Sequence, residues 1–156
     1  MAFPSISRIG KATFFLNAIL QRKVPSGIFG FYLAQNGSEL HLGGTNSDLY
    51  SGSIEYHPVI DMNIGNKTET AFWMLGGAEV YANGKNSGLS FKTIIDSGTS
   101  VIYGPPAQVE KFYQQIKGYQ ALPSPFNGFF AFPCNNMPKM SFRWGGRKEW
   151  TISKEE

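Results

Sequence analysis

The stretch Phe91–Pro106, FKTIIDSGTSVIYGPP, carries most of the information on fold and function. Its apolar residues Ile94–Ile95 predict the end of a strand that places Asp96 in a turn of small residues, and Val101–Tyr103 predicts a second strand leaving that turn. One carboxylate would then lie at the mouth of a tight loop. Gly98 would allow another backbone to approach closely, and the hydroxyls beside the carboxylate can donate hydrogen bonds to it.

Two interpretations of Asp96 fit this local pattern. In one, the carboxylate is structural and accepts hydrogen bonds from its own loop in an Asx turn. In the other, it is a functional carboxylate that the neighbouring hydroxyls orient. The sequence contains no HExxH, GxGxxG, GxxxxGK[ST] or GxSxG motif that would favour a different chemistry. Its two histidines, His41 and His57, lie in strand-like segments, where structural or surface roles are expected.

The composition predicts one folded domain. The chain has 156 residues, of which 42% are hydrophobic, 15% aromatic and 16% charged, a balance that excludes a disordered chain or a coiled coil. The net charge of +3 comes from basic residues scattered along the sequence, so we expect no nucleic-acid binding. The single cysteine, Cys134, excludes an internal disulfide or a cysteine-framed zinc site, and we expect it to be buried as a small hydrophobe.

The sequence has no apolar run long enough to cross a membrane. Ala12–Leu20 superficially resembles the apolar part of a signal peptide, but a polar residue interrupts it, and the basic stretch Gln21–Lys23 stands where a cleavage site would be needed. We therefore expect no export signal in this chain. The segment instead predicts a helix whose core-facing side carries Phe15, Ala18 and Ile19.

Beyond Pro25 the residue pattern is typical of a β-rich fold. Short segments with alternating, β-branched or aromatic residues are separated by clusters of Gly, Asn, Ser and Pro. Asn36–Ser38 and Asn83–Lys85 predict turns between strands. The expected strands are Ile28–Leu33, Glu39–Leu42, Ser53–Ile60, Ala71–Leu75, Ala78–Tyr81 and Leu89–Ile95, with further strand-like segments and a turn at Trp144–Arg147 within Phe129–Trp150.

A second helix is expected at Pro105–Ile116. Proline is tolerated in the first turn of a helix because its missing N–H donor would be unpaired there in any case. Val109, Phe112 and Ile116 fall on one apolar stripe at helical spacing, and Gly118 supplies a stop.

Several segments together resemble one protein family. Ile94–Ser100, IIDSGTS, resembles the hydrophobic-hydrophobic-Asp-Ser/Thr-Gly-Ser/Thr signature in the C-terminal lobe of pepsin-like aspartic proteases. Ser38–Gly44 followed by Asp48–Ile54 resembles the SEL.LGG and LY.G.I segment of the same lobe. Further matching segments are the aromatic-Trp pair Phe72–Trp73, the cysteine segment Phe132–Cys134, and Phe3–Ser7, which is similar to the end of the N-terminal lobe. The resemblance covers essentially the whole chain. Within the family, the sequence is most similar in general character to the secreted, polyporopepsin-like enzymes of fungi.

The resemblance implies the fold class and its division. The chain would be all-β, mainly β with short helices, and would form one lobe of the pepsin-like acid protease fold, a double-psi β-barrel that is incomplete here. Residues 1–27 would be the end of the N-terminal lobe with a connecting helix. Residues 28–156 would be a truncated C-terminal-lobe-like domain.

The resemblance also implies an activity and a site. Asp96 would be one of two catalytic carboxylates of an aspartic endopeptidase, and Ser97 and Thr99 would orient it. Gly98, Thr99 and Ser100 would contact a bound polypeptide substrate. Such enzymes use no metal or organic cofactor, work at acidic pH and are secreted, which implies an extracellular protein with no nucleic-acid or membrane partner.

The resemblance also predicts parts that this sequence lacks. Family members pair one Asp from each lobe, and the two carboxylates share a proton and activate a water. No Asp-Thr-Gly motif precedes Asp96 and no flap tyrosine is found, while the strand that completes the loop and the partner of Cys134 are expected beyond Glu156. We therefore expect the monomer to be inactive until it gains a second carboxylate.

The sequence leaves three hypotheses about the function of this chain open. The N-terminal lobe would supply the second Asp in an ordinary bilobal enzyme. A homodimer would instead bring two copies of Asp96 together across a twofold axis. In a third reading, the chain is a non-catalytic β-rich binding module with apolar surface exposed where the other lobe would dock. The tripeptides Asn36–Ser38 and Asn66–Thr68 are N-glycosylation acceptor sequences, which fit a secretory protein.

Overall fold

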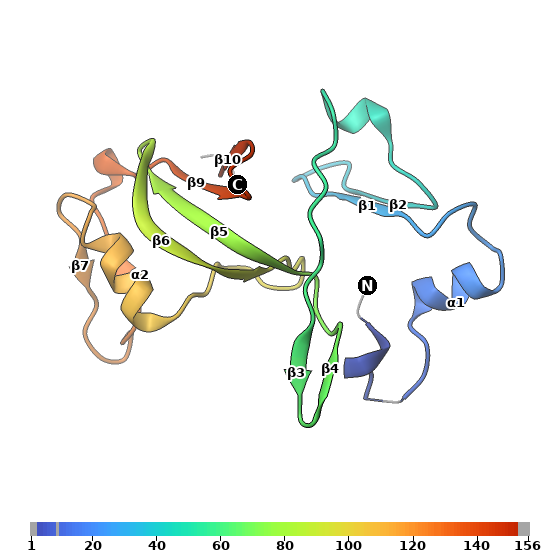
Figure 1. Ribbon diagram of the computed structural model, residues 1–156. Helices are drawn as coiled ribbons and strands as arrows, with labels where there is room; N and C mark the ends of the chain where they lie inside the picture. Colours follow the sequence, from blue (N-terminus) through green and yellow to red (C-terminus); the bar gives the residue numbers. More distant parts are fainter. Residues whose placement is uncertain (1–2, 9, 153–156) are drawn as a thin grey trace. The chain divides into compact units, whose positions relative to one another are not determined.

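The computed structural model describes residues 3–8 and 10–152. Within them the chain is mainly β, with two short α-helices and three short 3-10 helices. The elements, in chain order, are η1 (Pro4–Ile6), α1 (Phe14–Leu20), β1 (Phe29–Tyr32), β2 (Glu39–Leu42), η2 (Ser47–Leu49), β3 (Met62–Ile64), β4 (Lys67–Glu69), β5 (Met74–Ala82), β6 (Lys85–Ile94), α2 (Pro106–Tyr113), β7 (Gln120–Ala121), β8 (Phe130–Ala131), η3 (Cys134–Asn136), β9 (Met140–Trp144) and β10 (Glu149–Thr151) (Figure 1).

The chain divides into two compact units. Unit 1 consists of Met1–His57 and Asp61–Phe72, and unit 2 of Pro58–Ile60 and Trp73–Glu156. In unit 1, the helix expected near the start of the chain is confirmed as α1. Phe15 is its buried residue and packs edge-to-face on Phe29 of β1, with ring centroids 5.1 Å apart.

The first hairpin of unit 1 is also confirmed. β1 and β2 pair antiparallel with Phe29 opposite Leu42 and Tyr32 opposite Glu39. The loop between them closes on itself, because the Ser38 hydroxyl accepts a hydrogen bond from the N–H of Ala34 and donates one to its carbonyl oxygen. A polar turn of this kind fixes the pairing register of the two strands.

The strand expected at Ser53–Ile60 is wrong: no strand is assigned between η2 and β3. Pro58 has no N–H with which to join a ladder, and the boundary between the two units falls beside it. The pairing begins after Asp61 instead, where β3 and β4 form a short hairpin through the two-residue turn Gly65–Asn66. Gly65 has φ of +60° at the first turn position, as a type II′ turn requires.

Unit 2 is built on a four-stranded antiparallel sheet in the order β10-β9-β5-β6. The strands expected at Ala71–Leu75 and Ala78–Tyr81 are joined into the single strand β5, with a one-residue shift of register at Gly76–Gly77 that marks a bulge. The expected turn at Asn83–Lys85 is confirmed. Asn83 and Gly84 form the two-residue turn between β5 and β6. Their φ values of 52° and 74° are both positive, and turns of this kind match the twist of the flanking strands.

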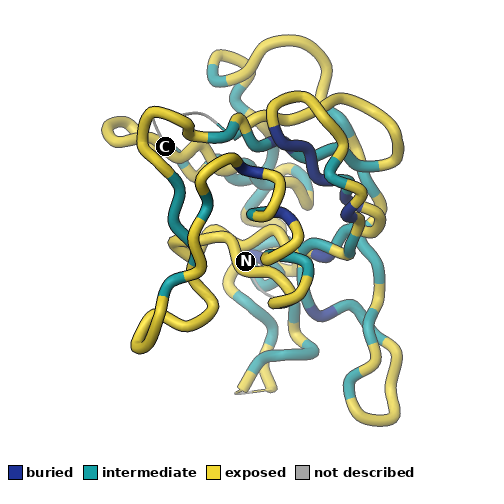
Figure 2. Tube along the Cα trace, turned by 90° about the vertical axis from the view of Figure 1, so that its left-hand side faces the viewer, coloured by how far each residue is buried: buried dark blue, intermediate teal, exposed yellow. Residues whose placement is uncertain are grey.

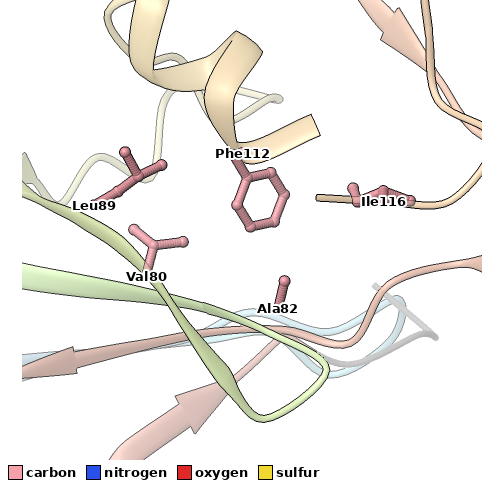
Figure 3. Close-up of a cluster of buried hydrophobic side chains, with 5 residues drawn as sticks. All are labelled: Val80, Ala82, Leu89, Phe112 and Ile116. Carbon is pink, nitrogen blue, oxygen red and sulfur yellow. The ribbon is translucent and has the colours of Figure 1, made fainter. Parts of the chain in front are cut away.

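The best-defined core lies between this sheet and α2. Phe112 of α2 points toward Val80 and Leu89 of the β5–β6 hairpin, and Ile116 approaches from the segment after the helix (Figure 3). The predicted apolar stripe of the helix is therefore confirmed in Phe112 and Ile116, which are 7% and 3% exposed. Elsewhere the buried stretches of the described trace are short and separated by exposed ones (Figure 2).

The mainly β architecture with short helices confirms the predicted fold class. The sheets of residues 3–8 and 10–152 are one of four strands and three of two strands, and none of them closes into a barrel, which agrees with the incomplete lobe expected from the sequence. No helix in this part of the chain has the length and apolar character needed to cross a membrane.

Candidate active site

The strand β6 delivers Asp96 to the surface of unit 2. β6 ends at Ile94, and the N–H of Ile95 still donates to the carbonyl oxygen of Trp73 at 2.9 Å, so that the hairpin pairing ends one residue before the carboxylate. The side chains near this end are also fixed, since the indole N–H of Trp144 donates to the hydroxyl of Thr93 at 2.9 Å. Asp96 therefore begins a loop on a firmly paired support.

The loop folds around the carboxylate of its own first residue. The backbone N–H of Gly98 donates to Oδ1 of Asp96 at 2.9 Å, and the hydroxyl of Thr99 donates to Oδ2. The hydrogen bond from Gly98 forms the Asx turn that the structural interpretation predicted. The hydrogen bond from Thr99 is the orienting hydroxyl contact that the functional interpretation predicted. The two interpretations are thus compatible in one geometry.

Both donors favour the ionised form of Asp96. The hydroxyl of Thr99, followed by the N–H of Gly98, lowers the pKa of Asp96 below its ordinary value, against a smaller opposing effect of desolvation. Gly98 also suits this position sterically, because a Cβ built there would lie 3.3 Å from Oδ1 of Asp96. An exposed, ionised carboxylate with both oxygens oriented can accept a proton from a water molecule or bind a cationic or hydrogen-bonding ligand.

All five residues expected at the site lie in this one exposed loop. Thr99 contacts the carboxylate through its side chain and Gly98 through its backbone. Among the hydrogen bonds of the described residues, none joins Ser97 or Ser100 to Asp96. Both serines are exposed.

The second strand expected at Val101–Tyr103 is wrong. No strand is assigned between β6 and α2, and the side chains of Val101, Ile102 and Tyr103 are 49%, 66% and 74% exposed. A strand needs a neighbour to satisfy its backbone, and the described part of the chain brings no strand alongside this segment. Ile94 and Ile95 just before Asp96 are exposed as well, so exposed apolar side chains flank the loop on both sides in the sequence.

Comparison with known proteins assigns the chain to a family. A family model described as eukaryotic aspartyl protease matches residues 1–156. The chain belongs to the eukaryotic aspartyl protease family. This confirms the resemblance seen in the sequence, and the Asp96 loop is the part of this aspartyl protease chain that carries the family-like signature.

Individual relatives agree with this assignment. An aspartic protease of Phaffia rhodozyma is 36% identical over 152 residues, which make up 94% of this chain and 35% of that protein. The secreted aspartyl protease 1 of Malassezia globosa is 30% identical over 95% of this chain and 35% of its own length. Cathepsin D of Chionodraco hamatus is 33% identical over 100% of this chain and 39% of its own length. The aspartyl protease chain described here thus spans well under half the length of these relatives.

Unit 1 of this aspartyl protease chain holds polar pairs that the sequence analysis missed. His41 lies 3.2 Å from Glu39 on β2, and His57 lies 2.6 Å from Glu55. Both are Glu-x-His pairs, and in extended backbone residues two apart point to the same face. The Glu-x-His spacing in the sequence could therefore have predicted both pairs.

The Glu39–His41 pair borders a pocket. Asn46 donates to both carboxylate oxygens of Glu39 at 3.2 Å. The adjoining pocket has a volume of about 190 Å³ and is lined by residues of β1, β2 and η2, together with Tyr50 and Ile54. Its mainly aromatic and aliphatic walls come from unit 1 alone.

Cys134 differs from its expected environment. It is exposed and unpaired at the start of η3, whereas the sequence predicted a buried side chain. The prolines and asparagines around it form a turn on the surface rather than a strand in the core. In the described residues, no three His, Cys, Asp or Glu side chains gather in a manner that could hold a metal ion.

Proposed function

We propose that Asp96 is one of the two catalytic carboxylates of an aspartic endopeptidase that hydrolyses peptide bonds with an activated water at acidic pH. One observation carries the proposal: in a chain of the aspartyl protease family, the Asp96 carboxylate is exposed and both of its oxygens accept hydrogen bonds from Gly98 and Thr99. The substrate would be an extended polypeptide, and no metal or organic cofactor is needed.

The electrostatics of Asp96 favour one role within the dyad. Its lowered pKa keeps it ionised in mild acid, so it would take the proton from the attacking water. The second carboxyl, held protonated because two like charges cannot both ionise at close range, would polarise the scissile carbonyl. The water oxygen then attacks the carbonyl carbon, and the proton held by Asp96 passes to the departing amine nitrogen as the C–N bond breaks.

The remaining loop residues would position the reactants. Thr99 orients the carboxylate through its hydroxyl, and Ser97 would reach the partner carboxyl across the dyad. Gly98 and Ser100, with Thr99, would offer backbone or hydroxyl contacts to the polypeptide. The exposure of this loop supports these roles because a substrate must reach all of these groups.

The second carboxylate would come from another lobe of a longer protein. In this proposal residues 1–27 end the N-terminal lobe and include its connecting helix, and residues 28–156 belong to the C-terminal lobe. The longer relatives support this, since the chain spans 35% of the Phaffia rhodozyma protein. The relative named as secreted supports passage through the secretory route and an extracellular location.

The test is cleavage of a denatured protein substrate at about pH 3 to 5, where a carboxylate dyad is active. The chain alone is compared with the chain joined behind the N-terminal part of the Phaffia rhodozyma relative. We expect cleavage only by the joined protein, abolished by Asp96→Asn and unaffected by Asp48→Asn, which removes another exposed carboxylate. Equal activity of the Asp96→Asn protein would contradict the proposal.

Two other results would identify the alternatives. Asp96-dependent cleavage by the chain alone, rising steeply with protein concentration, would identify a homodimer that pairs two copies of Asp96. A joined protein that is folded and inactive, and that still binds unfolded polypeptide, would identify a non-catalytic binding module. Circular dichroism and mass measurements on the same samples establish folding and oligomeric state.

A further inference from the structure

We propose that Asn66 carries an N-linked oligosaccharide, at the free end of the β3–β4 hairpin. The inference rests on the secretory route proposed above. The sequence contains two acceptor tripeptides in unit 1: Asn36–Ser38 lies between β1 and β2, and Asn66–Thr68 begins in the turn after β3 and runs into β4. Asn66 occupies the second position of the Gly65–Asn66 turn.

The hairpin is held at its base and free at its turn. At the base, the hydroxyl of Thr70 donates to Oδ1 of Asp61 at 2.5 Å, and the hydroxyl of Ser5 donates to the carbonyl oxygen of Thr70 at 2.5 Å. At the other end Gly65 and Asn66 are exposed, as are Lys67 and Thr68. A bulky group added at the turn therefore displaces no packed side chain of the described chain.

The acceptor groups at Asn66 are presented in an ordered way. The Thr68 hydroxyl donates to Oδ1 of Asn63, its cross-strand partner, at 2.7 Å, which links the two strands beside the turn. Within the part of the chain that the structure describes, the Asn66 side chain makes no hydrogen bond. Its amide nitrogen is thus accessible, and the residue after it, Lys67, is not a proline.

The modification is a group transfer from a lipid-linked oligosaccharide diphosphate. Nδ2 of Asn66 forms a bond to the anomeric carbon of the first sugar and loses one proton to the transferring enzyme. The bond between that carbon and the phosphate oxygen breaks, and its electron pair leaves with the lipid diphosphate. No oxidation or reduction takes place. The product is a neutral amide that carries a large hydrated chain.

A glycan at Asn66 would constrain the complete protein. The hydrated oligosaccharide must remain in solvent, so the turn of the β3–β4 hairpin could not be covered by another lobe or a second copy. Docking would be left to other surfaces, such as the apolar residues around Asp96, where Ile95 and Ile102 are 53% and 66% exposed.

The test uses the whole chain secreted from yeast behind a cleavable leader, with Asn36→Gln in every protein so that only one acceptor remains. We expect this protein to carry the mass of one oligosaccharide, removed by a glycan-cleaving amidase that converts the modified Asn66 to Asp. Adding Asn66→Gln or Thr68→Ala should remove the glycan. Adding Thr68→Ser, which keeps the hydroxyl, should retain it.

Secreted Asn36→Gln protein without a glycan would overturn the proposal, as would a glycan that persists in the Asn36→Gln, Asn66→Gln protein. The Thr68→Ser protein guards against misfolding as the cause of a loss, because it preserves the link to Asn63. Since the leader supplies entry to the secretory route and the readout is mass, a negative result leaves the proposed catalytic role of Asp96 intact. Conversely, loss of proteolysis in the Asp96→Asn protein has no bearing on the glycan.

Discussion

The hydroxyl of Thr99 donates a hydrogen bond to the carboxylate of Asp96, three residues earlier in the same loop. The N–H of Gly98 binds the other carboxylate oxygen. Because both donors prefer the ionised carboxylate, the conformation of the loop and the charge of Asp96 are linked. The ordered loop is most favoured above the ordinary pKa of the carboxyl, and this preference is lost as the pH falls through the lowered pKa of the folded chain.

Removing the Thr99 hydroxyl should therefore raise the pKa of Asp96. Thr99→Val keeps the shape of the side chain and removes the larger of the two stabilising hydrogen bonds. The measurement is an NMR titration of the Asp96 carboxyl carbon. Thr99→Ser keeps a donor and should leave the pKa low. An unchanged titration in Thr99→Val would mean that this hydrogen bond is not formed in solution.

The ion pair of Glu79 and Arg143 should shape the stability of unit 2 in acid. Nε and Nη2 of Arg143 each donate to Oε2 of Glu79 at 2.7 Å, and the guanidinium lies 4.9 Å from the ring centre of Tyr81. The hydrogen bond from Arg143 lowers the pKa of Glu79 below its ordinary value of 4.5. The pair's contribution is thus fully present above pH 4.5 and is lost as the pH falls through the lower folded pKa.

We expect Glu79→Gln to flatten the pH dependence of stability below the ordinary pKa of the Glu79 carboxyl. Urea unfolding at a series of pH values measures this. Arg143→Lys keeps the charge and loses the forked donor, so it should retain only part of the dependence. If wild-type and Glu79→Gln curves run parallel through this range, the pair contributes nothing to acid stability.

Truncating Phe112 should destabilise the core of unit 2. Phe112 is 7% exposed and packs on Val80 and Leu89, so Phe112→Ala leaves a cavity and should cost about 3 to 5 kcal/mol of unfolding free energy. Phe126→Ala is the matched control, since Phe126 is 59% exposed and its truncation should change stability by less than about 0.5 kcal/mol. Similar unfolding midpoints for the two variants would refute this assignment of the core.

Two substitutions of Asn83 separate the backbone and side-chain contributions that this residue makes to stability in the turn between β5 and β6. Asn83 has φ of 52°, and its Oδ1 accepts a hydrogen bond from the N–H of Lys139 at 2.9 Å. Asn83→Ala loses the hydrogen bond and strains the backbone, at a cost of about 1 to 3 kcal/mol. Asn83→Gly loses only the hydrogen bond and should be milder. Thermal unfolding of both variants checks the order, and the reverse order would contradict the assigned geometry.

Local sequence signals predicted the parts of the fold that depend on local geometry. The turn at Asn83–Gly84, the β1–β2 hairpin and the two helices follow from residue preferences over a few positions, and all were confirmed within a few residues of their ends. The predicted strand at Val101–Tyr103 failed because strand formation depends on a distant partner, which a sequence window does not contain. The buried position expected for Cys134 was wrong because the residue lies in a short surface 3-10 helix, η3, directly after Pro133.

The candidate site was only partly foreseeable. The spacing of Asp96 and Thr99 within one tight turn predicted a hydroxyl beside the carboxylate, and Thr99 forms that contact. The family resemblance also assigned an orienting role to Ser97, which stays a proposal because no hydrogen bond of the described residues joins Ser97 to Asp96. The Glu39–His41 and Glu55–His57 pairs were missed because each histidine was considered without its neighbour two residues before.

The β5–β6 hairpin has two unlike ends. Its closed end, at Asn83–Gly84, is tied to Lys139 and lies beside the core that includes Val80 and Ala82, whereas its open end leads past Ile94 and Ile95, half exposed, into Asp96. Amide hydrogens should accordingly exchange slowly near the turn and progressively faster toward the loop. If Asp96 is catalytic, the hairpin would therefore present it at its less protected end, while the turn at Asn83–Gly84 stays anchored to Lys139.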